Sequence, residues 1–140
     1  MCLRRVVLAT ALSAALLACG GGGSSSKSSS AGRTDAIRSC LEAAKVDTTT
    51  SNDKAVGVSD DFKRVIAHED PTDKNTITEI FVFDSNAQAR QNRPALTLQT
   101  EDNQLNQVIG PVVVRFGHVP QTAYRSTVTG CVEQATSSGS

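Results

Sequence analysis

The chain has 140 residues, and 14 lysines and arginines balance 14 aspartates and glutamates, so its formal net charge is zero. This balance excludes the strongly basic surface of a nucleic-acid binder and offers no electrostatic steering of a charged partner. Aromatic residues make up 4% of the chain and tryptophan is absent, which disfavours an aromatic platform for sugar stacking.

The first residues have the composition of an export signal. Arg4 and Arg5 give a positive start, and the apolar run 6–18 follows them. This run is too short to cross a bilayer as a helix, which needs about 20 residues. A positive start, a short apolar core and small residues at the cleavage point are typical of a secretory signal peptide. We therefore expect residues 1–18 to be a signal peptide that is removed.

The apolar run ends in Leu16-Leu17-Ala18-Cys19. The order and spacing resemble the lipobox of bacterial lipoproteins, in which a small residue precedes the lipidated cysteine. The resemblance implies cleavage after Ala18, a diacylglyceryl thioether on Cys19 and an acyl chain on its amino group. Two or more acyl chains anchor a protein stably to a membrane, because a single acyl chain binds only reversibly. It implies a lipid-anchored protein on the outer, extracytoplasmic face of a bacterial membrane. The alternative is a secreted protein with an unmodified Cys19.

Glycine and serine dominate the segment after Cys19. Such a composition cannot bury enough surface to offset the entropy of ordering, so residues 19–33 are predicted to be a flexible tether. One small domain is expected over residues 34–136, and residues 137–140 are expected to fray.

The domain is predicted to open with a helix that Thr34 caps. Ile37, Cys40 and Leu41 lie on one face of that helix, which is expected to contact the core. A polar loop is expected over residues 47–52.

Strands are predicted from runs of β-branched and aromatic residues. Residues 55–58 are a weak candidate, and residues 62–67 are a better one. The strongest strand is 76–83, whose apolar run without alternation is typical of a strand covered on both faces. Residues 112–116 form another convincing strand.

Two more helices are predicted. Ser85 and Gln88 match the S-x-x-Q capping box at the start of the first of them, and Pro94 is expected to stop or kink it. The last helix begins after Pro120 and places Val128 and Cys131 on one face.

The order of these elements predicts an α+β two-layer sandwich. The strand–helix–strand segment from 76 to 117 can form a right-handed parallel crossover. We therefore expect a mixed sheet of three or four strands, with three helices mainly on one face.

Cys40 and Cys131 are the cysteines left to the domain, because Cys2 leaves with the signal peptide and Cys19 takes the lipid. In an exported chain they are predicted to form a disulfide. This requires the two terminal helices to lie side by side, with the Cα atoms within about 7 Å. The alternative, a metal-binding or catalytic pair, lacks supporting residues nearby in the sequence.

Two histidines are the candidates for chemistry. His68 precedes Glu69, Asp70 and Asp73, which could form a divalent-metal or acid–base site, but a solvated turn is favoured because no metal-binding motif is present. His118 follows Gly117 at the end of a predicted strand, and a surface histidine is favoured there because no acid or nucleophile is near it in sequence. No cofactor-binding motif and no catalytic residues are identified.

The domain also resembles small exported bacterial proteins that carry no assigned activity. The matching segments are the Cys-Leu-x-x-Ala of 40–44, the valines of 112–114 and the Pro-x-Thr-Ala of 120–123 before Cys131. We expect a non-enzymatic binding or interaction module that meets the membrane through lipid on Cys19 and binds no nucleic acid. A hydrolase-like exported enzyme and an envelope structural or assembly factor are the alternatives. The sequence identifies no protein or small-molecule partner.

Overall fold

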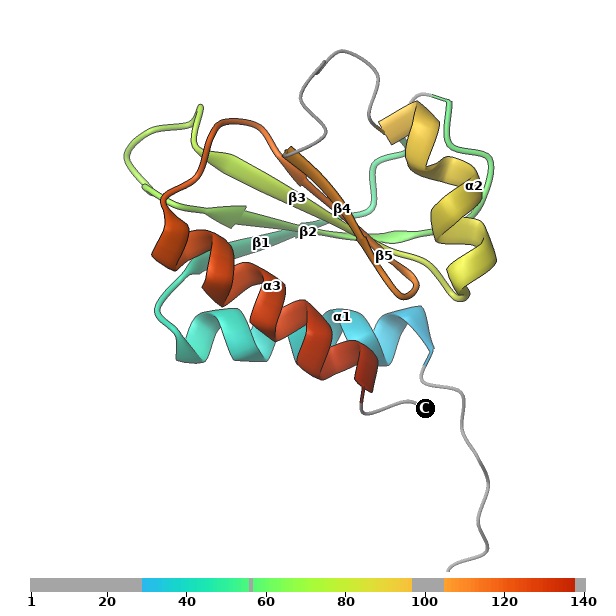
Figure 1. The fold of residues 1–140 in the computed structure, drawn as a ribbon, viewed down its shortest axis with the longest axis horizontal. Helices are drawn as coiled ribbons and strands as arrows, with labels where there is room; N and C mark the ends of the chain where they lie inside the picture. The colour runs from blue at the N-terminus through green and yellow to red at the C-terminus, as the bar shows by residue number, and fades with distance from the viewer. Residues whose placement is uncertain (1–28, 56, 97–104, 138–140) are drawn as a thin grey trace, which may run out of the picture.

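The computed structural model describes residues 29–55, 57–96 and 105–137, and the predicted signal peptide and Cys19 lie outside them. The described residues form an α+β fold of three helices and a five-stranded open sheet (Figure 1). The helices are α1 (Ser30–Ala43), α2 (Asn86–Leu96) and α3 (Thr122–Ser137). The strands are β1 (Asp47–Ser51), β2 (Lys63–His68), β3 (Ile77–Val82), β4 (Asn106–Ile109) and β5 (Val112–Phe116).

The sheet is antiparallel throughout, so the predicted mixed sheet and parallel crossover are wrong. Its strand order is β1-β2-β3-β5-β4, and every neighbouring pair is antiparallel. The difference comes from β4, for which the sequence makes no prediction. The chain passes through β4 at the edge, turns at Gly110, which has a φ of 55°, and returns as β5 beside β3. This hairpin reverses the chain direction, so β5 runs antiparallel to β3.

The three stronger strand predictions are confirmed as β2, β3 and β5, but the predicted loop 47–52 and the weak strand candidate 55–58 are wrong. The predicted loop 47–52 is largely β1, where three successive threonines favour the extended backbone through their β-branched side chains. The described residues of the predicted strand 55–58 are not in a strand; Ala55 and Val58 pack against the buried Phe81 cluster instead.

The sheet is covered differently on its two faces (Figure 1). On one face α1 and α3 pack over the main core, in which Leu41, Ile80 and Val132 are fully buried. On the other face α2 contributes to a smaller cluster around Phe81 and Val113. The prediction of helices mainly on one face therefore fits α1 and α3 but not α2. Apolar residues of β3 contribute to both clusters, as the unbroken apolar run predicts.

A disulfide joins α1 to α3. It links Cys40 to Cys131, the pair that the sequence predicts, with a Cα–Cα distance of 5.6 Å. Cys131 is buried in the main core, and Cys40 is partly buried beside it. The first and last helices of the domain therefore lie side by side and are covalently linked.

α1 begins earlier than the sequence predicts, because Ser29 caps it rather than Thr34. The Ser29 hydroxyl accepts from the Gly32 N–H at 3.3 Å, and Thr34 lies inside the helix, where its hydroxyl donates to the Ser30 carbonyl. The buried Arg33 side chain donates to the Phe83 carbonyl at 2.7 Å. The last residues of the predicted tether therefore form the first turn of α1. A hydrogen bond from this turn joins α1 to the segment just after β3.

The capping box of α2 is confirmed. The Gln88 N–H donates to the Ser85 hydroxyl at 3.3 Å, and the Ser85 N–H donates to the Gln88 side-chain oxygen at 3.1 Å. The helix does not stop at Pro94, however, and continues to Leu96.

We predict that replacing Cys40 and Cys131 together by alanine lowers the free energy of unfolding by about 4–5 kcal/mol, because the bridge restricts a long loop of the unfolded chain. Urea denaturation followed by circular dichroism measures this difference, and the parent protein treated with a thiol reductant is the matched control. A loss below about 1 kcal/mol would contradict the predicted contribution of the bridge.

A second prediction concerns Asp84, whose pKa is lowered from its ordinary value of 3.8 by hydrogen bonds from Ser30 and by the charge of Arg33. The folded state favours the ionised carboxylate, so Asp84 stabilises the protein above pH 3.8 and loses this effect as the pH falls through the lowered pKa. Asp84→Ala should cost less than about 1 kcal/mol at neutral pH, because the carboxylate is exposed. Denaturation at several pH values tests this, and a pH-independent cost would disprove it.

Candidate functional site

The structure brings His118 against Glu69, two residues that the sequence places far apart. The His118 Nε2 atom and the Glu69 Oε2 atom are in hydrogen-bond contact. Their side chains are only 20% and 11% exposed. The expectations of a surface histidine at 118 and a solvated side chain at 69 are therefore wrong, because each buries the other's polar group.

The rest of the His68 segment behaves as a turn. The Asp70 carboxylate accepts from the Thr72 N–H at 2.8 Å and from its hydroxyl at 2.6 Å, and these bonds lower the Asp70 pKa. The Asp73 carboxylate accepts from the Asn75 N–H at 2.9 Å. These local hydrogen bonds are typical of turns and leave the two aspartates exposed, as the sequence predicts.

The Glu69–His118 pair lies between the turn after β2 and the start of α3. The second Glu69 oxygen accepts from the Gln121 N–H at 2.9 Å. Nearby, the Tyr124 hydroxyl donates to the Thr78 hydroxyl at 3.1 Å, and burial raises the pKa of Tyr124. The pair therefore fastens the N-terminus of α3 to the end of the sheet.

A cavity of about 410 Å³ adjoins this pair, and it is lined by Glu69, Asp70, Pro71, Thr76, His118, Val119 and Gln121. Neither nitrogen of the His118 imidazole is both accessible to solvent and free of a partner. Nε2 contacts Glu69, and Nδ1 is buried with no hydrogen-bond partner within the described residues. The geometry favours a structural role for this pair over acid–base chemistry.

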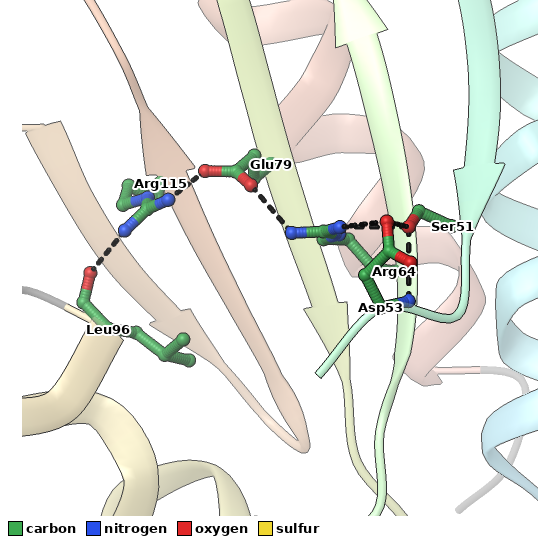
Figure 2. Close-up of polar contacts among 6 residues, drawn as sticks. All are labelled: Ser51, Asp53, Arg64, Glu79, Leu96 and Arg115. Atoms are coloured by element: carbon green, nitrogen blue, oxygen red, sulfur yellow. Dashed lines mark hydrogen bonds and ion pairs between the residues drawn. The ribbon is translucent and has the colours of Figure 1, made fainter. Parts of the chain in front are cut away.

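Sequence reasoning missed a second charged cluster, the Arg64–Glu79–Arg115 ladder, which crosses β2, β3 and β5 (Figure 2). The Arg64 Nη1 atom lies 3.2 Å from one Glu79 carboxylate oxygen, and the Arg115 Nη2 atom contacts the other. The three residues share the sheet face opposite α1 and α3, because side chains alternate along each strand. Glu79 is 12% exposed, so both guanidinium groups neutralise a largely buried carboxylate.

Both ends of the ladder continue into neighbouring elements, as Figure 2 shows. At one end Arg64 donates to the Ser51 hydroxyl on β1 at 2.8 Å and lies 3.3 Å from the Asp53 carboxylate. At the other end Arg115 donates to the Leu96 carbonyl, the last residue of α2, at 3.1 Å. The network thus connects the β1 edge to α2.

The ladder has the chemistry of a structural network. Both Glu79 oxygens are occupied by guanidinium groups, so the carboxylate is not placed to act as a base. Arginine stays protonated in proteins and carries no nucleophile. A signal for the ladder was present in the sequence, since Arg64 and Glu79 are charged residues within predicted strands, but their contact depends on a strand register that the sequence does not show.

A cavity of about 500 Å³ lies beside the segment that leads into β2. Its lining mixes the acids Asp60 and Asp61 with Lys54 and Lys63. Its wall is held by Asn92, which donates to the Asp60 carboxylate at 2.6 Å. A lining of mixed sign favours no charged ligand over another.

Within residues 29–55, 57–96 and 105–137, no group of three or more histidine, cysteine or acidic side chains could hold a metal ion. In the same part of the chain, no helix has the length and apolar character needed to span a membrane. No protein-family model matches the chain, and no curated protein or solved structure is significantly similar to it.

We predict that Glu79→Met lowers the free energy of unfolding by about 2–3 kcal/mol, because it leaves two guanidinium groups on a largely buried face without their carboxylate. The double variant Arg64→Met with Glu79→Met should lose less than the sum of the two single variants. Chemical denaturation of the four proteins gives the coupling free energy. Additive losses would show that the ladder does not act as a unit.

Proposed function

We propose that this chain is a lipoprotein anchored through Cys19 to the outer, extracytoplasmic face of a bacterial membrane. The observation that carries the proposal is the sequence Leu16-Leu17-Ala18-Cys19, which lies between a short apolar run and a Gly/Ser-rich segment. A diacylglyceryl group on the Cys19 sulfur and an acyl chain on its amino group supply the two or more chains that stable anchoring needs.

Two features of the domain support this proposal. The Cys40–Cys131 disulfide suits a chain that folds in an oxidising, exported compartment. The first turn of α1 begins at Ser30, about ten residues after Cys19. A Gly/Ser-rich linker of this length has a mean reach of about 18 Å, so the domain would stay close to the lipid headgroups.

The domain's proposed role is that of a binding or interaction module. Its candidate acid–base groups already have partners. Glu79 contacts two arginines, and Glu69 contacts His118. Its sheet, in contrast, ends in β1, which has no strand on its outer side in the described part of the chain. An open strand edge is a common docking surface, because its backbone groups can pair with another strand.

Cys19→Ala should abolish incorporation of a labelled fatty acid into the protein, because the acylated sulfur is removed. Growth of cells expressing the full chain with labelled fatty acid, followed by capture of the protein, measures the incorporation. Cys2→Ala is the matched control and should keep full labelling, since Cys2 belongs to the predicted signal peptide. Labelling that survives Cys19→Ala would refute the anchor.

A further inference from the structure

The outward-facing backbone groups of β1 can be identified from the hydrogen bonds of the sheet. The Glu69 N–H donates to the Thr76 carbonyl at 3.0 Å, which makes residues 69 and 76 a hydrogen-bonded pair between the β2 and β3 strands. Because the backbone groups of successive strand residues point to opposite sides, His68, Ile66 and Arg64 bond toward β1.

The same alternation applies to β1. The strand partners of His68, Ile66 and Arg64 are Asp47, Thr49 and Ser51. Their backbone groups therefore point toward β2, and the N–H and C=O groups of Thr48 and Thr50 point outward.

We propose that a second copy of this chain pairs with β1 in the antiparallel direction, across a two-fold axis that passes beside Thr49. In this register Thr48 lies opposite the partner's Thr50. Each such pair exchanges two N–H···O=C hydrogen bonds, because outward-facing groups meet outward-facing groups. The two sheets then form one continuous sheet.

The sequence of β1, Asp-Thr-Thr-Thr-Ser, is complementary to itself in this register. Thr49 meets the partner's Thr49, and threonine pairs across strands are favourable. The strand also lacks the lysine, proline or bulge that proteins commonly place on an edge to prevent pairing.

The polar side chains at the two ends of β1 also meet in this register. The same register places Asp47 opposite the partner's Ser51, on the face of the sheet that carries the ladder. Arg64 already extends to the Ser51 hydroxyl, as Figure 2 shows. Each Asp47 carboxylate therefore approaches the guanidinium of the partner's Arg64, where it would compete with the exposed Asp53 carboxylate that already lies 3.3 Å from that guanidinium. The two-fold axis makes this contact twice.

The proposed contact between two copies of β1 is small. Its occupancy at a membrane rests on the proposed function, the lipid anchor on Cys19. Copies anchored through Cys19 share one surface, which raises their effective concentration without any new contact. The register itself does not depend on the lipid, so it can be tested on purified protein.

The direct test is Thr49→Cys in the full chain, purified in detergent and oxidised. Residues opposite each other in a non-hydrogen-bonded pair have Cα atoms about 4.5 Å apart, which a disulfide can bridge. A covalent dimer on a non-reducing gel is expected. Ser126→Cys, exposed on α3, controls for random collision, and the unsubstituted chain controls for Cys2 and Cys19. Cross-linking no greater than that of Ser126→Cys would overturn the proposal.

A second pair of variants tests the register through charge. Thr49→Lys places two like charges opposite each other at the axis and should weaken self-association about tenfold, whereas Thr49→Val should not weaken it. Sedimentation measures association, and thermal melting verifies the fold, since Thr49 is exposed. Equal association of both variants, or capture of another protein's strand in place of a second copy, would overturn the proposal. If the cross-link forms but protein extracted from its native membranes carries no lipid on Cys19, the pairing is supported and only the anchor is refuted.

Discussion

The packing of α1 and α3 on one face of the antiparallel sheet, with the Cys40–Cys131 bridge between them, is the constraint on which the rest of the structure depends. The two helices are the ends of the domain, so the bridge and the shared core join its first and last elements. Arg33 adds a contact between α1 and the carbonyl of Phe83. Because this face is fully used by the core, the opposite face is left for α2 and for polar contacts.

That opposite face connects stability to the proposed function. Glu79 compensates two arginines, and the ladder passes from the end of α2 to Ser51 on β1. The same guanidinium that stabilises the sheet thus lies at the open edge, where the proposed second copy brings Asp47. The proposed pairing of two β1 edges would make the domain an interaction module, and the proposed anchoring at one surface would raise the occupancy of this weak contact.

The sequence predicts the elements that bury apolar side chains and misses those that do not. The strands β2, β3 and β5 are visible because β-branched and aromatic residues cluster in them, and the disulfide follows from having two cysteines left in the domain. The β1 edge is polar and exposed, so it carries no alternating pattern. Because the sequence does not reveal β4, it predicts that β5 runs parallel to β3, whereas the two strands are antiparallel. The ladder and the Glu69–His118 pair depend on register and on loop closure, which local patterns do not encode.

The most direct test of the central claim is the intact mass of the protein extracted from its native membranes, measured with and without reductant. The proposal predicts a chain that begins at Cys19, carries acyl groups, and gains the mass of two hydrogen atoms when the Cys40–Cys131 bridge is reduced. A soluble product without lipid, or a membrane-bound chain with an unmodified Cys19, would contradict the claim that this domain is held at a membrane surface.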